Sequence, residues 1–239
     1  MLSTILKTVV VLFLVSTYKT LPFAYLIRFY ALVFKHIVVH KNAFIQTRKN
    51  TFGYGSSKLD IFKAVSYSTY ASPLEIDMYL HKSNSTYLID LDIARTSFVC
   101  QLFQKLFMNA WLNETGEFKS QSLQNCPYIP VGTIQCVFKR EIKLFQRYTI
   151  TSNVLAWDNK WLYILLKFEA TDGKLCALGI TKYVFKKKGR ITLRPREFIA
   201  ECGMYNDEVE AINQKNYELV SHLESSEGLE ELAARMEKS

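Results

Sequence analysis

Apolar residues follow three successive patterns along the chain. Residues 2–34 are almost continuously apolar, with only isolated charged residues. From about Asn84, apolar residues recur at steps of three and four, which is the spacing of an amphipathic helix. Between residues 133 and 185 the period changes to two, which is the spacing of β-strands. The chain therefore predicts an apolar N-terminal segment, one long helix and then a set of strands.

The helical pattern predicts a helix of about six turns. One of the polar residues at 83–85 is expected to cap its first turn, because short polar side chains accept hydrogen bonds from the unpaired N–H groups there. Asp90, Asp92 and Arg95 are expected to face away from the apolar side. The apolar side is expected to contain Tyr87, Leu88, Leu91, Ala94, Phe98, Leu102 and Leu106.

Five strands are predicted around this helix. The first begins near Ile61 and ends before Pro73. The other four are expected to form a meander, with "DN" and the Asp-Gly of "TDGK" as turns. Their sequences are "TIQCVFKREIKLF", "YTITSNVLAW", "KWLYILLKFEA" and "LCALGITKYVF". Strand, long helix and four antiparallel strands predict an α+β fold with one central helix along one face of a curved sheet.

Charge and cysteine content exclude several classes of function. The net charge is +8, but residues 1–59 contain eight basic and no acidic residues, so the rest of the chain sums to zero and nucleic acid is not an expected partner. The five cysteines include no CxxC pair, so neither a disulfide framework nor a metal site is expected. No GxSxG, GxGxxG or P-loop motif is present, and no cofactor is predicted.

Residues 1–49 are predicted to form a hydrophobic membrane-anchor segment. A retained signal anchor, a cleaved signal peptide and an organelle presequence are the alternatives. Lys35, Lys41, Arg48 and Lys49 follow the apolar run and favour the cytosolic side for what comes next. We expect the endoplasmic reticulum membrane, with the domain facing the cytosol and the mitochondrion as the alternative. Whether the segment spans the bilayer or lies in its interface is left open.

The remaining boundaries follow from composition. Residues 50–202 are predicted to be the folded domain, and residues 203–239 an acidic C-terminal tail. Val209, Ile212, Leu219 and Leu223 give that tail a loose helical periodicity. It is expected to cover the sheet or to form a short exposed helix, and it contains no candidate chemistry.

A short motif precedes the predicted helix. Residues 75–87 read E-x-D-x-x-L-H-x-S-N-x-x-Y. This resembles the D-x-D-x-x-G-H-x-N-N-x-x-Y pattern of many hotdog-fold thioesterases, and "WDNKW" at 157–161 resembles their hairpin region. The apolar N-terminus fits the membrane-anchored branch, which includes thioesterase superfamily member six and fungal relatives. The chain departs from the pattern at Glu75, Leu80 and Ser83.

The resemblance implies roles for three residues. Asp77 would be the base or nucleophile, His81 would orient water or donate a hydrogen bond, and Asn84 would cap the helix whose free N–H groups stabilise an oxyanion. The alternative interpretation is structural: Asp77 caps a turn, His81 is a packing residue and Asn84 is an ordinary N-cap.

A basic cluster near the end of the last strand is the candidate substrate-binding region. Lys186, Lys187, Lys188 and Arg190 would contact the phosphates of coenzyme A, anionic lipid headgroups, or only solvent.

The predicted function is hydrolysis of acyl-CoA or a related acyl thioester in lipid metabolism. The alternative is a non-catalytic, membrane-associated protein of the same fold that binds acyl lipids or acts as a scaffold. The expected partners are the acyl thioester, membrane lipid and a second copy of the chain, since the resemblance implies a homodimer. A hydratase that uses His81 as its base is a weaker third interpretation.

Overall fold

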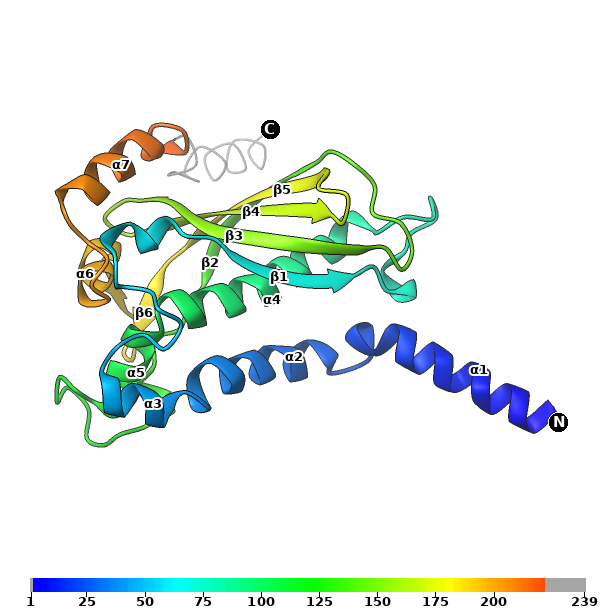
Figure 1. Ribbon diagram of the computed structural model, residues 1–239, viewed down its shortest axis with the longest axis horizontal. Coiled ribbons are helices and arrows are strands. Elements are labelled where there is room, and N and C mark those ends of the chain that lie inside the picture. Colours follow the sequence, from blue (N-terminus) through cyan, green and yellow to red (C-terminus); the bar gives the residue numbers. More distant parts are fainter. Residues whose placement is uncertain (1, 222–239) are drawn as a thin grey trace, which may run out of the picture.

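A five-stranded antiparallel sheet curves around one long helix, α4, in the computed structural model, which describes residues 2–221 (Figure 1). This is the hotdog arrangement that the sequence predicts. The strands of the sheet are β1 (Val65–Tyr70), β2 (Val131–Phe138), β3 (Arg147–Trp157), β4 (Leu162–Ala170) and β5 (Leu175–Tyr183). A small hairpin follows, formed by β6 (Phe185–Lys187) and β7 (Ile191–Leu193). The helices are α1 (Leu2–Thr17), α2 (Ala24–Val33), α3 (Lys41–Thr47), α4 (Asn84–Leu102), α5 (Gln104–Leu112), α6 (Pro195–Glu201) and α7 (Asp207–Tyr217).

The strand order is β1-β3-β4-β5-β2, so the predicted four-strand meander is wrong in one respect. β3, β4 and β5 do form a meander, but β2 pairs with β5 and lies at the opposite edge from β1. The physical reason is the connection at residues 139–146, which is long enough to carry the chain from one edge of the sheet to β3. It passes the residues just before α4, where Lys82 N–H donates to the Ile142 carbonyl at 2.8 Å.

The central helix begins at Asn84 as predicted, but its faces differ from the expected pattern. Tyr87, Leu91 and Phe98 are buried against the sheet. Leu88 was assigned to that apolar side and is 42% exposed, whereas Asp90 was expected to face away and is fully buried. Periodicity alone misplaced Asp90 because the prediction assumed that no core position holds a charge. Arg95, also expected to face away, is buried.

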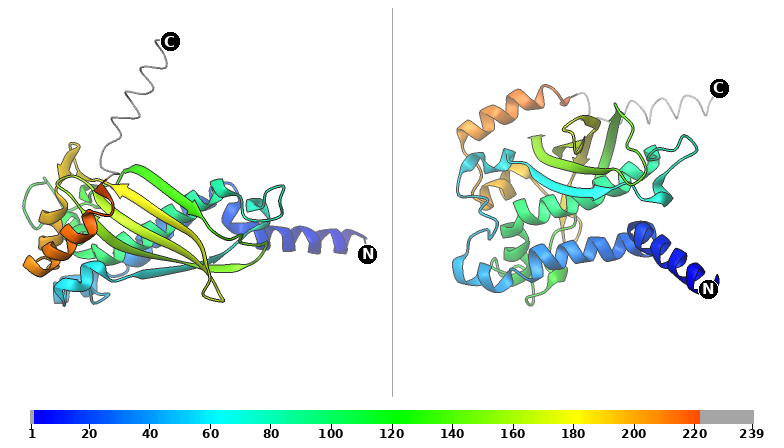
Figure 2. Two further views of the ribbon diagram at one scale, coloured as in Figure 1. Left: turned by 90° about the horizontal axis from the view of Figure 1, so that it is seen from above. Right: turned by 45° about the vertical axis from the view of Figure 1, so that its right-hand side comes forward.

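The N-terminal segment packs on the domain. α2 lies beside α4 on the side opposite the sheet, and α1 extends past the domain at one end (Figures 1 and 2). The turn between α1 and α2 is anchored, since Thr17 is buried and Lys19 is only 3% exposed. The Tyr70 hydroxyl at the end of β1 donates to the Ser16 carbonyl at 2.8 Å. Residues before the predicted boundary at residue 49 thus pack against residues after it.

One helical stretch, Ser3–Thr20, is long and apolar enough to cross a membrane by length and composition. A signal sequence or a core helix of a soluble protein has the same properties. Only 11% of that stretch is buried in the described structure, so its apolar side chains face outward.

The tail contains one helix in the described residues. α7 packs on β3, with Val209 fully buried, and the Asn213 side chain bonds both the N–H and the carbonyl of Trp157. The described part of the tail therefore covers part of the sheet, which was expected as the alternative to a short exposed helix. Leu223, the last residue of the predicted pattern, lies outside the described residues.

His36 provides a prediction about acid stability. Its ring is buried behind α2, with Nε2 3.3 Å from the Ser97 hydroxyl and, within the described structure, no partner for Nδ1. Burial lowers the pKa of His36 from 6.5 to about 4. The unfolded chain therefore takes up a proton on His36 at a higher pH than the folded chain does. The free energy of unfolding is highest above about pH 6.5 and falls as the pH drops toward 4. We expect a loss of roughly 2–3 kcal/mol over that range.

Unfolding by denaturant at pH 7 and pH 4.5 measures this effect. His36→Phe is expected to remove most of the difference between the two pH values. An unchanged difference in the variant would assign the acid sensitivity to other groups.

Candidate active site

The loop that precedes α4 is closed by its own backbone. Asp77 N–H donates to the His81 carbonyl at 3.0 Å, and the Asp77 carbonyl accepts from Leu80 N–H at 3.0 Å. The Asp77 carboxylate also accepts from Tyr79 N–H at 2.9 Å. Leu80 has φ +61°, a left-handed conformation that glycine adopts most easily. The turn brings the carboxylate of Asp77 and the ring of His81 to the same side.

Asp77 and His81 lie together, as the sequence predicted. The carboxylate oxygen Oδ2 is 3.6 Å from His81 Nδ1. On the other side of the ring, Nε2 is 3.8 Å from the carboxylate of Glu141. Both Asp77 and His81 are about a quarter exposed, so a substrate can reach them. The histidine therefore sits between two carboxylates at the surface of the domain.

A pocket of about 190 Å³ opens beside this histidine. One wall contains His81, Asn84 and Tyr87, and the other comes from the end of β2 and the connection after it, including Phe138 and Glu141. Glu141 was not predicted as a site residue. It reaches the pocket only because the β2–β3 connection passes the start of α4, a feature that a predicted meander does not contain.

The first turn of α4 points at the same region. Asn84 is the first helical residue, and Ser83 occupies the N-cap position. The predicted capping role of Asn84 is therefore wrong. Asn84 lies one residue after the N-cap position, the position from which a side chain accepts hydrogen bonds from the N–H groups of the first turn. Among the described residues the Ser83 side chain makes no capping hydrogen bond. Thr86 N–H donates to the Ser83 carbonyl at 3.0 Å, so the oxyanion donors of this turn are the N–H groups before it, which have no partner within a helix. The helix dipole is positive there. The site thus combines a carboxylate, an imidazole and backbone donors.

A buried cluster of charges, which the sequence pattern did not predict, lies directly behind the pocket. Lys82 Nζ is 3.0 Å from Glu75 and 2.9 Å from Asp90, with all three side chains almost fully buried. The Tyr148 hydroxyl donates to the same Asp90 carboxylate. These cationic and hydroxyl partners outweigh the burial of Asp90 and lower its pKa to about 2. Lys82 therefore ties the site loop to the middle of α4.

The N-terminal segment completes this cluster. Lys19 Nζ lies 2.9 Å from Glu75 and 3.2 Å from Asp90, and Arg28 Nη2 lies 3.1 Å from Asp90. The sequence contains one signal for this role. Lys19 and Arg28 interrupt an otherwise apolar run, and a charge in such a position requires a partner. Nothing in the local pattern identifies that partner.

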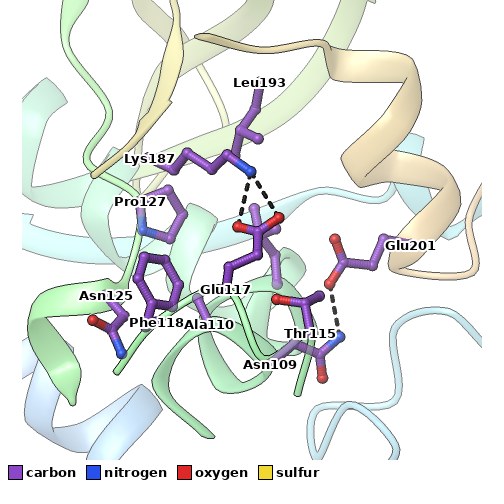
Figure 3. Close-up of a pocket in the computed structure, with 11 residues that line it drawn as sticks. Asn109, Ala110, Thr115, Glu117, Phe118, Asn125, Pro127, Lys187, Leu193 and Glu201 are labelled. Atoms are coloured by element: carbon purple, nitrogen blue, oxygen red, sulfur yellow. Dashed lines mark hydrogen bonds and ion pairs between the residues drawn. The ribbon is translucent and has the colours of Figure 1, made fainter. Parts of the chain in front are cut away.

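The predicted basic cluster lies at the other end of the molecule. The pocket is at the first turn of α4, whereas β6 packs near its last turn, where the Phe185 and Phe103 ring centroids are 5.4 Å apart (Figure 1). One chain therefore does not bring the two predicted groups together. Lys187 is paired with both carboxylate oxygens of Glu117, at 2.9 and 3.0 Å (Figure 3). Lys186 bonds Thr192, and Lys188 and Arg190 are exposed in the turn.

Leu80 allows a test of the strained turn. Leu80→Gly is expected to raise the free energy of unfolding by about 0.5–1 kcal/mol, because it removes the left-handed strain of a side chain that is 78% exposed. Chemical denaturation measures the change. Leu74→Gly is the matched control: this leucine is also exposed but has no positive φ, so glycine there should destabilise the fold. Destabilisation by Leu80→Gly would show that the turn is unstrained.

Comparisons with known proteins identify the family of the chain. A family model described as "Thioesterase-like superfamily" matches residues 71–203. The yeast Saccharomyces cerevisiae protein described as "Probable thioesterase YBR096W" is 38% identical over 219 residues, covering 91% of this chain and 89% of that protein. "Protein THEM6" of Xenopus laevis is 28% identical over 112 residues, covering 46% of this chain and 47% of that protein.

Solved structures also resemble the chain. The DHNA-CoA thioesterase of Staphylococcus aureus aligns with a TM-score of 0.46 at 14% identity. The alignment covers 64% of this chain and 94% of that one.

Proposed function

Since the chain belongs to the thioesterase-like superfamily, we propose that it hydrolyses acyl-CoA or a related acyl thioester at the first turn of α4. The observation that carries this proposal is the placement of His81 in the wall of a pocket at a helix N-terminus, with the Asp77 carboxylate 3.6 Å from the His81 ring. Hydrolysis requires a base or nucleophile at the carbonyl carbon and donors for the oxygen that becomes negative, and this site provides both.

In the proposed reaction, the thioester oxygen points toward the N–H groups of the first turn of α4. By one route, the Asp77 carboxylate takes a proton from a water whose oxygen attacks the carbonyl carbon, the C–S bond then breaks, and the departing thiolate of coenzyme A takes up that proton. By the other route, Asp77 attacks the carbonyl carbon itself and the C–S bond breaks to give a mixed anhydride and the thiolate; water then hydrolyses the anhydride, which frees Asp77 and supplies the proton for the thiolate. His81 holds the water or the carboxylate in place. The products are a free fatty acid and the thiol.

The dimer proposed from the resemblance is supported by β2. This strand lies at the edge of the sheet, and its Val131, Ile134, Val137 and Phe138 are exposed. An exposed apolar edge strand is a surface on which a second strand pairs. Because Phe138 also lines the pocket, a partner strand at β2 would close the site. Lys188 and Arg190 are then proposed to meet the phosphates of a substrate bound near the partner subunit.

The membrane location is likewise a proposal. The apolar side chains of α1 face outward, and the anchored turn at Lys19 leaves no flexible linker between that helix and the domain. The tip of the site loop lies at the same end, with Met78 and Tyr79 both highly exposed. An apolar helix and an apolar tip at one end support contact with a bilayer. We propose the endoplasmic reticulum, with the domain in the cytosol and a role in lipid metabolism; the mitochondrion is the alternative.

The test uses the full chain in detergent micelles with acyl-CoAs of increasing chain length. Free coenzyme A is measured with a thiol reagent, and the matching oxygen esters are the control. Release from thioesters but not from oxygen esters supports the proposal.

A second function is favoured by one observation. Leu80 stands where the family pattern has glycine, so the backbone at the site is strained and carries a large exposed side chain. A protein that binds the acyl thioester without cleaving it would tolerate this change. Binding of acyl-CoA without release of the thiol supports this second function.

A further inference from the structure

One side of α2 presents large apolar side chains to the outside, and no helix or strand of the described residues lies over it (Figures 1 and 2). Four positions at steps of four, three and four residues share this side of the helix. They are Phe23, Ile27, Tyr30 and Phe34, and they form the outer face of α2. Each is between 58% and 76% exposed. The opposite side of α2 packs on α4, so the outer face is the side left without a partner.

The size of this face indicates a docking surface. At 1.5 Å per residue, the distance along the helix from Phe23 to Phe34 is about 16 Å. Leu26 lies beside this line, is 47% exposed and widens it. Single exposed apolar residues are common on proteins, but a contiguous patch of large ones marks contact with another protein or with a membrane.

The charges around the outer face of α2 favour an anionic bilayer. Residues 1–59 contain no acidic residue. Lys35 and Lys49 are exposed, and in the part of the chain that the structure describes neither is paired with a carboxylate. The segment also contacts the carboxylates of Asp92 and Glu114, and each of these is paired with an arginine. A lysine beside an apolar helix face reaches lipid phosphates while its stem stays in the interface.

The geometry of α2 excludes a transmembrane position for this helix. Its ten residues are about 15 Å long, which is half of a 30 Å hydrocarbon core. Its inner side is also fixed to α4. α1 is the longer and more exposed helix, and the turn at Lys19 joins it rigidly to α2 through the buried charge cluster. The apolar surface of α1 continues through the exposed Tyr18 to Phe23. Such a pair of helices enters the bilayer with α1 and lies along its surface with α2.

We infer that the outer face of α2 lies in the plane of an anionic lipid bilayer, with its four apolar side chains at the level of the headgroups and upper acyl chains and Lys35 at the phosphates. The inference rests on the proposed function only through the membrane location, and hydrolysis is not needed for it. It also gives the domain a fixed orientation. α4 lies directly above α2, and the sheet is on the side away from the bilayer (Figure 1).

Tryptophan fluorescence of the full chain in vesicles tests this inference. The vesicles contain phosphatidylglycerol and phosphatidylcholine that carry bromine, a quencher of nearby tryptophan, on either the upper or the lower part of the acyl chains. Tyr30→Trp reports on the outer face of α2, and Val11→Trp reports on α1. Leu219→Trp is the matched control at an exposed position beyond α7. The signal of the three native tryptophans is measured in the wild type and subtracted.

We expect the Tyr30→Trp signal to fall more with upper-chain bromine than with lower-chain bromine, and the Leu219→Trp signal to stay unchanged. Adding Ile27→Glu and Phe34→Glu, both at exposed positions, should abolish the quenching of Tyr30→Trp and leave that of Val11→Trp. Each large apolar side chain withdrawn from water contributes about tenfold or more to the binding constant, so the docked population should fall by about a hundredfold.

Four results would overturn the inference. Quenching of Val11→Trp alone would leave the membrane anchor in place and remove α2 from the surface. An absence of quenching in both variants would remove the proposed membrane location as well. Stronger quenching of Tyr30→Trp by lower-chain bromine would place α2 across the bilayer. A disulfide between two Tyr30→Cys chains in dilute vesicles would assign the face to a second copy of the chain. Release of coenzyme A is recorded separately in the same vesicles, so a failure of the proposed hydrolysis is distinguishable from each of these results.

Discussion

Asp90→Asn is expected to destabilise the folded chain by about 3–5 kcal/mol. Asp90 is fully buried and is bonded by Lys19, Lys82, Arg28 and Tyr148. Without the charge of Asp90, Glu75 is the one carboxylate left beside the buried Lys19 and Lys82. A buried charge without a counter-charge is among the largest single losses in the free energy of unfolding.

Denaturant unfolding of the full chain in micelles measures this loss. Asp172→Asn is the control, since Asp172 is an exposed residue of a hairpin turn and its surface ion pairs contribute little. A loss below about 1 kcal/mol in Asp90→Asn would mean that the cluster does not hold the N-terminal segment to the domain. The same reasoning predicts that residues 50–239 alone are much less stable than the full chain, because Lys19 and Arg28 are removed.

The pH dependence of this contribution has a definite sign. The pKa of Asp90 is lowered from 3.8 to about 2 in the folded chain. Its stabilising contribution is therefore fully present above about pH 4 and is lost as the pH falls toward 2. This pH range lies below the range of about 6.5 to 4 in which His36 lowers the free energy of unfolding. The contributions of Asp90 and His36 are therefore separable in one series of unfolding measurements at different pH values.

Asp77→Asn is expected to lower kcat for thioester hydrolysis by about a hundredfold or more, because a single acid–base group contributes on that scale. His81→Ala should cause a loss of similar size. Since the two side chains are 3.6 Å apart and act on the same reacting group, the double variant should lose little more than either single variant.

Two control measurements accompany these single and double variants: acyl-CoA affinity and the free energy of unfolding. Acyl-CoA binding and the free energy of unfolding should change little, since both side chains are partly exposed and are not part of the buried cluster. Losses that multiply in the double variant would show that Asp77 and His81 act independently, and an unaffected kcat would place the chemistry elsewhere in the pocket.

Local patterns predicted the elements of the fold well. The helix start at Asn84 and the three strands of the meander follow from periodicity and turn residues, which are properties of neighbouring positions. The place of β2 is not such a property. Its pairing with β5 depends on the path of residues 139–146 across the end of α4, which no local pattern contains.

The candidate site was predicted in part for the same reason. Asp77 and His81 are four residues apart, and a single turn brings them together. Glu141 and the cluster of Lys19, Glu75 and Asp90 come from distant segments, and only the folded chain places them side by side. The sequence signal for this cluster is Asp90, a charged residue three positions after Tyr87 and one before Leu91, on the helix face that the apolar residues define.

The measurement that tests the central claim most directly is the release of coenzyme A from hexadecanoyl-CoA by the full chain, with wild type and Asp77→Asn assayed side by side. The account predicts many turnovers by the wild type and at least a hundredfold fewer by the variant at equal protein stability. Equal rates in the two proteins would contradict the assignment of the site. Recovery of intact hexadecanoyl-CoA from a complex with the wild type would contradict hydrolysis itself.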